Sequence, residues 1–435
     1  MKMLKGGIAM DLTNYPELAT YAKQVAEPTW FTEERLLALQ ASETLKMPSF
    51  QKIKYRHWPI NLTKQLAYEE SKLEVPEEID QAKATAVQVG QTTKLLNLSP
   101  ALKEQGVIIC DWQTALKEHA DLIQAYFMKK AIKSTENRLT AEHVAKLTSG
   151  LLIYVPKNVV LTEPLVTYFV QDATTGADYV HHVLLIADTN SEVSYLENML
   201  TVGQSESTAN IIVEVIALDG SHVKFSSIDR LGQKTTAYLN RRGYLKRDAK
   251  IDWSLGMMSD GNIVGDYDSE LVGTGSHAET KVIAISTGKQ VQGIDTRVTN
   301  YGKNSIGHIL QHGVILQNSN LIFNGIGHVM KGATGADAQQ ESRVLMLSRH
   351  ARGDANPILL IDDNNVTAGH AASVGRVDEE QLYYLMSRGL PKPIAERLVI
   401  RGFLGPVLAA IPSRAIQIEL ENMIERKLVD GQRDE

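Results

Sequence analysis

The spacing of apolar residues along the chain changes twice and divides the sequence into three parts. Over residues 1–145 apolar residues recur mostly at helical spacing, which predicts a mostly helical N-terminal domain. Over residues 146–375 they form short runs separated by turn residues, which predicts a core of β-strands without helices. Over residues 376–435 helical spacing returns, which predicts a C-terminal helical domain. The chain is therefore expected to be mainly β, with helical flanks.

The N-terminal part also contains two stretches that favour strands. Thr85–Leu98 is rich in β-branched residues and is consistent with a strand pair, and Gly106–Trp112 resembles a short buried strand. Nearer the start of the chain, Thr32 is placed to cap a helix, because Glu33 and Glu34 suit the positive end of a helix. The N-terminal part is thus predicted to mix helices with a few strands.

Two architectures fit the strand core equally well. Asp-Gly pairs such as Asp219-Gly220 and Asp260-Gly261 favour tight hairpins, and therefore an antiparallel sandwich. A three-residue pattern recurs where strands begin: a small residue, then any residue, then an apolar or small residue. This recurrence favours the stacked coils of a solenoid. This recurrence is seen in Ser191-Glu192-Val193, Ser221-His222-Val223, Ala249-Lys250-Ile251, Ser276-His277-Ala278 and Ser319-Asn320-Leu321. The pattern alone leaves a sandwich and a solenoid open.

The C-terminal part has clear helix boundaries. Asp378, with Gln381 three residues later, predicts the start of a first helix, and Gly389 is a suitable residue just beyond its end. Pro393 suits the first turn of a second helix. These signals predict a helical hairpin directly after the strand core.

Composition excludes several classes of function. The formal net charge of −6 gives no electrostatic case for binding nucleic acid or anionic lipid. The longest apolar runs, such as Ile211–Leu218, are far shorter than the ~20 residues that cross a bilayer. Met1–Met10 lacks an apolar stretch that would serve as a signal peptide. A soluble, cytoplasmic protein is therefore expected.

Few side chains offer metal or catalytic chemistry. Cys110 is the only cysteine and lies in an apolar run, so it is expected to be a buried hydrophobe, and one thiolate cannot hold a metal alone. His308 and His312 would share one face of a strand and could bind a metal with a third ligand, although such pairs are more often packed or solvated. His370 lies among small residues, Ala368 to Ser373, which leave its imidazole accessible. His370 is the best single candidate.

The chain resembles the SufB/SufD proteins of the SUF iron–sulfur cluster assembly system. The likeness is strongest from Arg343 to Leu408, which includes Val374-Gly375-Arg376-Val377-Asp378-Glu379-Glu380-Gln381-Leu382 and Leu398-Val399-Ile400-Arg401-Gly402-Phe403-Leu404. Ile153-Tyr154-Val155-Pro156 resembles the start of the family's core. Having a single cysteine, outside the core, the chain is more similar to the SufD type than to the cysteine-richer SufB type.

The resemblance implies a right-handed parallel β-helix core and a non-catalytic scaffold role. It implies a complex with a SufB-like subunit and two copies of a SufC-like ABC ATPase, and a homodimer when the chain is alone. His370 matches a histidine near the SufB boundary, and the resemblance implies that it is an iron or cluster ligand. Ala368 replaces a cysteine of some relatives. The residues that match the ATPase-docking region are Arg388, Gly389, Arg401, Gly402 and Phe403.

The resemblance implies no permanently bound cofactor, while a transient iron–sulfur cluster at the SufB interface is compatible with it. Two other functions stay open from the residues. A β-helix carbohydrate-active enzyme would need an acidic or acid–arginine cluster in one groove. The candidate carboxylates are scattered without a decisive pair: Asp248, Asp252, Asp260, Asp266, Asp268 and Glu270. A structural homodimer without a metal role would need none of these groups.

Overall fold

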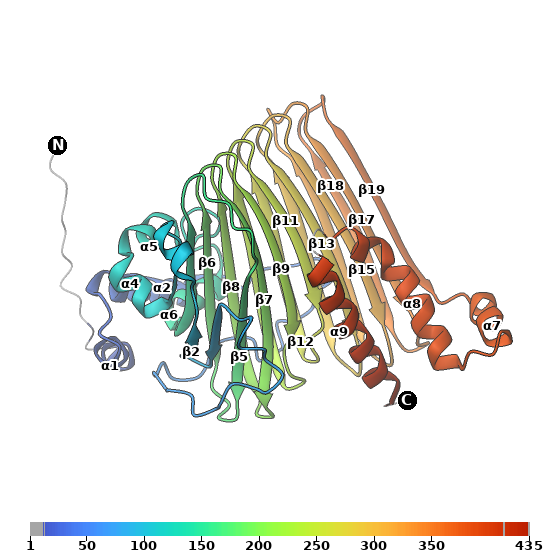
Figure 1. The fold of residues 1–435 in the computed structure, drawn as a ribbon, viewed down its shortest axis with the longest axis horizontal. Helices are drawn as coiled ribbons and strands as arrows, with labels where there is room; N and C mark the ends of the chain where they lie inside the picture. Colours follow the sequence, from blue (N-terminus) through green and yellow to red (C-terminus); the bar gives the residue numbers. More distant parts are fainter. Residues whose placement is uncertain (1–11, 13, 412–413, 434–435) are drawn as a thin grey trace.

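The structure is a computed structural model that describes residues 12, 14–411 and 414–433. Its centre is a parallel β-solenoid of about eight turns, built from two facing sheets (Figure 1). The expected parallel β-helix is confirmed, and the antiparallel sandwich is excluded. Met1–Met10, where no signal peptide is expected, lies outside the described residues.

The two sheets alternate along the chain. Sheet A contains, in chain order, β1 (Ala86–Val89), β2 (Thr92–Leu96), β5 (Leu165–Ala173), β7 (Glu192–Gly203), β9 (His222–Arg230), β11 (Lys250–Met257), β13 (His277–Ser286), β15 (Ile306–Ile315), β17 (Asp337–Met346) and β19 (Thr367–Arg376). Sheet B contains β3 (Ile108–Asp111), β4 (Ser149–Val155), β6 (Tyr179–Ala187), β8 (Ser207–Ala217), β10 (Thr235–Leu245), β12 (Asn262–Leu271), β14 (Val291–Asn300), β16 (Asn320–Val329) and β18 (Arg352–Ile361).

Successive strands of each sheet pair in parallel register, so equivalent side chains stack along the solenoid. Inside, Tyr195 of β7 lies opposite Phe225 of β9, which lies opposite Trp253 of β11. The ring centroids in this stack are 5.2 and 4.8 Å apart. Because every coil adds an apolar layer to the previous one, the core is continuous along the solenoid axis.

The corners before β7, β9, β11, β13, β15 and β17 of sheet A explain four of the five recurrences of small residues, and the fifth, at Ser319, precedes β16 of sheet B. The residue just before the small one has a positive φ in successive coils, namely Asn190, Gly220, Asp248, Gly275, Asn304 and Gly335. The small residues that follow, such as Ser191 and Ser276, are buried at the inside of the corner. Backbone bonds continue from coil to coil through these corners, as from Asn190 N to Asp219 O at 2.9 Å. The small residues thus mark a structural column of the solenoid.

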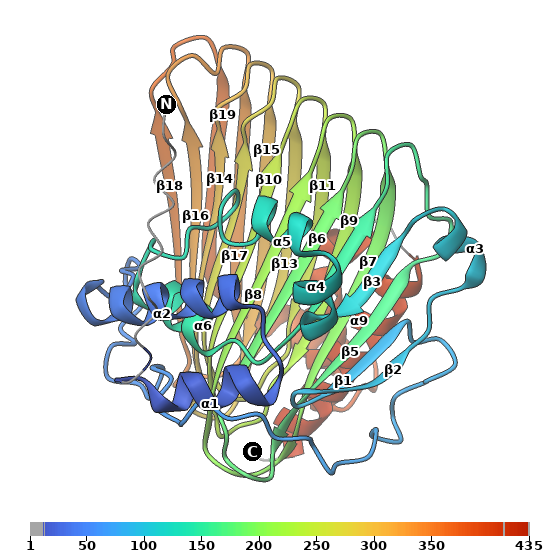
Figure 2. The same ribbon diagram turned by 90° about the vertical axis from the view of Figure 1, so that its left-hand side faces the viewer.

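Helices cover the two outer faces. The described helices are α1 (Pro16–Gln24), α2 (Thr29–Thr44), α3 (Pro100–Glu104), α4 (Trp112–Glu118), α5 (Ala120–Tyr126), α6 (Arg138–Lys146), α7 (Glu379–Ser387), α8 (Lys392–Ala409) and α9 (Arg414–Arg433). Figure 2 shows α2, α4, α5 and α6 on the side of sheet B, where Phe31 and Trp112 pack against Leu152 and Leu184. On sheet A, Leu404 of α8 and Leu420 of α9 join the apolar cluster that covers the sheet. None of the described helices is both long and apolar enough to cross a bilayer.

The expected N-terminal strands form, and one expected helix boundary is wrong. Thr85–Leu98 contains the antiparallel pair β1–β2, and β1 also pairs with β5, so this region extends sheet A. The helix assigned to a Thr32 cap begins at Thr29 instead, directly after the extended residue Pro28. The Thr32 hydroxyl donates to Oε1 of Glu27 at 3.0 Å, so it stabilises the preceding loop.

A row of amides and carboxylates runs along the outer face of sheet B beneath the N-terminal segment. It consists of Asn240, Asp266, Asp295, Asn324 and Asn356, one from each successive strand. Asn324 Nδ2 donates to Oδ1 of Asp295 at 2.8 Å, and Asn356 Nδ2 donates to Oδ1 of Asn324 at 2.9 Å. Burial and the neighbouring Asp266 carboxylate raise the pKa of Asp295 to about 7.

We expect Asp295→Asn to stabilise the protein increasingly as the pH rises. The ordinary pKa of the carboxyl is 3.8. Its contribution to stability is full below that value and is lost as the pH rises through about 7. Relative to wild type, the variant should gain about 1 to 3 kcal/mol between pH 5 and pH 8. Thermal unfolding midpoints at both pH values measure this gain, and a difference independent of pH would contradict it.

Lys427 attaches α9 to the solenoid. Its Nζ donates to Met258 O at 2.9 Å, to Ser259 O and to Asp260 Oδ1 at 2.7 Å. The side chain is only 9% exposed. Lys427→Met would keep the buried stem and leave two backbone carbonyls without this donor, so we expect a loss of about 1 to 3 kcal/mol.

The matched control is Arg426→Met on the same helix. Arg426 makes one exposed contact, from Nη1 to Oε2 of Glu78 at 3.3 Å. Exposed ion pairs contribute about 0 to 1 kcal/mol. Hydrogen exchange across Arg414–Arg433 should speed up in the Lys427 variant and change little in the control. Equal effects of the two substitutions would show that Lys427 is not the anchor.

Candidate functional site

The solenoid has one covered end and one open end. At the covered end, β1, β2 and β3 extend the sheets, and the N-terminal helices lie beside them (Figure 2). At the open end, β18 and β19 pair with a described strand on one side only. Most residues of β19 are exposed, and Leu360, Ile361 and Val374 place apolar side chains in solvent there. The open end thus presents two strand edges with exposed apolar groups.

His370 lies on β19 at this open end. It is directly opposite Gln340 of β17, which is 5% exposed and belongs to the row of side chains inside the solenoid. His370 therefore belongs to the same interior row, but no described coil lies above it, and it is exposed. Within the described residues no hydrogen bond or ion pair engages its imidazole, so both ring nitrogens are accessible.

The interior beneath His370 is polar. Gln311 Nε2 donates to Thr296 Oγ1 at 2.7 Å, and Ser342 Oγ donates to Gln311 Oε1 at 2.8 Å. Gln340 Nε2 donates to Ile358 O at 2.8 Å, while the buried Gln340 Oε1 has no hydrogen-bond donor among the described residues. Since buried acceptors are normally paired, the layer below His370 is suited to a further polar neighbour.

No thiol lies near His370 in the described part of the chain. Ala368, two residues before His370 on the same face of β19, lies opposite Ala338 and packs with Val366 and the small apolar residues around Ala338. Cys110 is buried on β3 at the covered end, as expected from its apolar run. Burial raises the pKa of the Cys110 thiol to about 12. Any thiolate ligand at the open end would have to come from another chain.

The C-terminal helices begin beside the open end. Asp378 caps α7 by accepting a hydrogen bond from Glu380 N at 2.9 Å, and Gly389 follows the helix with a φ of 91°. Both predicted boundaries are confirmed. None of the residues of α7 is buried, and Figure 1 shows that α7 stands away from the sheets. The helix is therefore poorly supported by the rest of the chain.

An apolar surface, which we name the hairpin patch, covers α7 and the start of α8. Its members are large apolar side chains that are between 39% and 75% exposed: Tyr383, Tyr384, Met386, Ile394 and Leu398. The sequence did not identify the two tyrosines, because helical spacing selects Leu382, Leu385 and Met386 as the apolar face. Leu382 and Leu385 are half-buried, whereas Met386 is exposed beside the tyrosines. Exposed apolar side chains on and beside a helix that has no buried residue are typical of a docking surface.

The five residues assigned to ATPase docking differ in their surroundings. Arg388 lies over the ring of Tyr384 at 5.2 Å, beside the hairpin patch. Gly402 is exposed with open space around it. Arg401 pairs with Glu425 of α9 at 3.1 Å, and the ring of Phe403 stacks on His312 with centroids 4.9 Å apart. Arg401 and Phe403 therefore help to hold α8 in place.

The predicted pair His308 and His312 shares the outer face of β15 but is not brought together. His312 Nδ1 donates to Phe403 O at 2.9 Å, and its Nε2 lies 3.1 Å from Oε1 of Glu341, so it holds α8. His308 contacts carboxylates of neighbouring coils instead. Of the acidic residues weighed for glycan cleavage, Asp252 lies on β11 and Asp248 and Asp260 lie in turns. Asp266, Asp268 and Glu270 share one face of β12.

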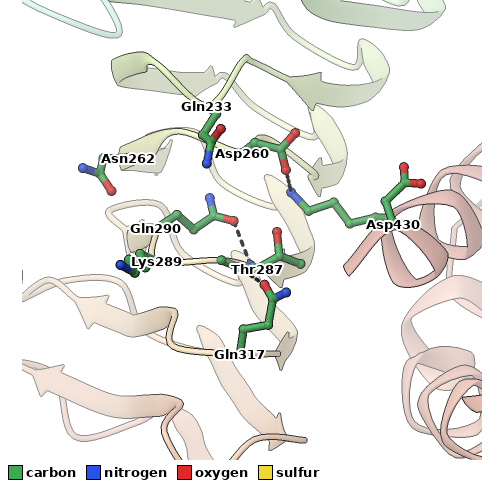
Figure 3. A pocket seen from close by; sticks show the side chains of 10 residues that line it. Gln233, Asp260, Asn262, Thr287, Lys289, Gln290, Gln317 and Asp430 are labelled. Atoms are coloured by element: carbon green, nitrogen blue, oxygen red, sulfur yellow. Dashed lines mark hydrogen bonds and ion pairs between the residues drawn. The ribbon is translucent and has the colours of Figure 1, made fainter. Parts of the chain in front are cut away.

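A polar hollow of about 450 Å³ lies between the solenoid turns and α9 (Figure 3). Its lining includes Thr287, Gly288 and Lys289. The loop amides already have acceptors, because Thr287 N donates to Gln290 Oε1 at 2.9 Å and Gly288 N donates to Oε1 of Gln317. These bonds fix the turns, so we assign the hollow a structural part in seating α9.

Comparison with known proteins agrees with this architecture. Residues 169–403 match the family described as SUF system FeS cluster assembly, SufBD core domain, and residues 30–166 match the SufBD protein N-terminal region. The iron-sulfur cluster assembly protein SufD of Bacillus subtilis (strain 168) is 44% identical over 424 residues, which are 94% of this chain and 97% of the relative.

An iron-sulfur cluster assembly SufBD family protein of Staphylococcus epidermidis (strain ATCC 12228) is 27% identical over 434 residues, which are 93% of this chain and 92% of that protein. Both family regions and both relatives thus cover most of the chain. The chain therefore belongs to the SufBD family of the SUF iron–sulfur cluster assembly system, and within this family it resembles SufD.

Proposed function

We propose that the chain is a non-catalytic, cytoplasmic scaffold subunit of a SUF complex. It pairs with a SufB-like subunit through the open end and binds a SufC-like ABC ATPase through the hairpin patch. A complex of this kind contains two ATPase copies, one on each scaffold subunit. The observation that carries the proposal is the open end, where β18 and β19 each leave one strand edge unpaired among the described residues.

The physical reason for pairing is the cost of these edges. A bare edge exposes a row of backbone donors and acceptors and is prone to join another strand. Addition of a partner strand pairs these groups, and burial of Leu360, Ile361 and Val374 adds a hydrophobic contribution. A second copy of the chain offers the same edges, which supports a homodimer when the SufB-like subunit is absent.

The cargo of the complex, a nascent iron–sulfur cluster, would lie at this boundary. His370 supplies an imidazole there, and neutral imidazole is an acceptable iron ligand. Because the sole cysteine is buried at the covered end, thiolate ligands would come from the SufB-like subunit. The cluster is transient, so no permanently bound cofactor is part of the proposal.

Co-expression with SufB-like and SufC-like proteins of the same organism tests the proposal. Size exclusion with light scattering should show one copy of each scaffold subunit and two of the ATPase. Replacing both Tyr383 and Tyr384 by serine should remove the ATPase copy bound to this chain, because two exposed rings leave the hairpin patch. Leu37→Ser, at an exposed apolar position on α2, is the control and should leave two copies.

A chain that stays alone in the presence of both partners would overturn the scaffold proposal. If the complex forms with two ATPase copies in spite of the Tyr383 and Tyr384 substitutions, the ATPase binds elsewhere.

The role of His370 has a separate test. His370→Ala should leave the fold and the complex intact, because the side chain is exposed and makes no described bond, while the yield of cluster on the complex falls several-fold. The iron and sulfide content after reconstitution measures this yield. His350→Ala, in the exposed turn before β18, is the matched control and should not change it. An unchanged yield in the His370 variant would exclude it as a ligand.

A further inference from the structure

Two histidines and one glutamate from neighbouring coils meet on the outer face of sheet A. His277 and Glu279 share one face of β13, and Glu279 lies directly opposite His308 of β15. Nε2 of His277 is 2.8 Å from Oε1 of Glu279, and Nδ1 of His308 is 3.0 Å from the same oxygen. One ligand atom from each residue lies within 4.8 Å of the other two.

The backbone holds these three side chains in position. β13 and β15 are each paired on both sides, so the three residues stand on the most regular part of the solenoid. Donor atoms on paired strands are better fixed than donors on loops. The side chains are between 24% and 32% exposed, which leaves one side of the cluster open to solvent.

A further carboxylate orients one of the histidines. The other ring nitrogen of His308, Nε2, lies 3.3 Å from Oδ2 of Asp337 on β17. In metal sites the second nitrogen of a ligating histidine commonly donates to a carboxylate, which fixes the nitrogen that faces the ion. Here that arrangement leaves Nδ1 of His308 directed at the oxygen it shares with His277.

The charges around the cluster favour a cation. Glu279 and Asp337 bring two negative charges, against one positive charge from Lys281, whose Nζ is 4.0 Å from Oε2 of Glu279. His222 on β9 lies in the same row of residues as His277, two strands away. It contacts Asp252 at 2.7 Å with no second histidine, which is an ordinary ion pair. The convergence of two imidazoles on one carboxylate oxygen distinguishes the cluster at Glu279.

We propose that His277, Glu279 and His308 bind one divalent first-row transition-metal ion such as Zn²⁺ or Fe²⁺, with water completing the coordination. Two imidazole nitrogens and one carboxylate oxygen suit these ions, whereas Ca²⁺ and Mg²⁺ prefer oxygen ligands alone. The site lies on the outer face of sheet A, and β17 stands between its β15 ligand and β19, whereas His370 stands on the interior face of β19. It is therefore distinct from His370 and does not depend on the proposed scaffold role.

The test uses the full-length chain alone, without a histidine tag and stripped of metal by a chelator. Titration with Co²⁺, followed by visible absorbance, should show one equivalent bound, and Zn²⁺ should displace it. His277→Ala and His308→Ala should each weaken Co²⁺ binding by more than about tenfold, because each removes a ligand, and loss of a group that only orients a ligand already costs about 10- to 100-fold. Asp337→Asn should weaken it less, because Asp337 only orients His308.

His222→Ala is the matched control, since the His222 side chain is about as exposed as that of His277 and also contacts a carboxylate. It should bind Co²⁺ as wild type does. Thermal unfolding midpoints close to wild type would show that each variant is folded. The proposal is overturned if the wild-type chain takes up no stoichiometric Co²⁺, or if His222→Ala weakens binding as much as His308→Ala does.

Discussion

The parallel register between successive coils is the constraint on which the rest of the structure depends. Each coil is joined to the previous one by continuous backbone hydrogen bonds. A residue in one coil therefore stacks directly on the residue at the equivalent position of the previous coil. This produces the aromatic stack at Phe225 inside, the corner column that contains Ser191 and Ser276, and the amide row through Asn324 outside. It also brings residues from separate coils together, as it does for Glu279 and His308.

The same register creates the need for a partner. A solenoid has two ends, and the described strands and helices of this chain cover one of them. At the other end the register stops at β18 and β19, where polar interior groups and exposed apolar side chains meet solvent. The C-terminal helices start beside that end and carry a second apolar surface. Both exposed surfaces are thus near one another, which suits a subunit that links a second scaffold protein to an ATPase.

Much of the fold could be predicted from the sequence, because local signals for strands, turns and caps are strong here. The strand core, the cap at Asp378 and the recurrence at Ser191, Ser221 and Ala249 all have direct structural counterparts. The sequence pattern could not separate hairpins from coils, since Asp-Gly pairs suit hairpin turns and the corners of this solenoid alike. The family resemblance supplied that distinction.

The candidate sites were predictable to different degrees. His370 could be found because its small neighbours and the family likeness both point to it. The cluster at Glu279 could not, because spacing within one strand pairs His308 with His312, while its actual neighbours come from the preceding coil. Coil lengths vary along the chain, so the residue opposite His308 cannot be counted from the sequence. The exposed tyrosines of the hairpin patch were missed because helical spacing selects the apolar face of α7 that includes Leu382 and Leu385, and the tyrosines lie outside that pattern.

Amide hydrogen exchange of β18 and β19 tests the central claim most directly. The rates should be compared between the isolated chain at high dilution and its complex with the SufB-like subunit. Pairing through the open end predicts much slower exchange in Arg352–Ile361 and Thr367–Arg376 within the complex, with little change in the interior strands β9 and β11. A complex that forms while β18 and β19 exchange as fast as in the isolated chain would contradict the account.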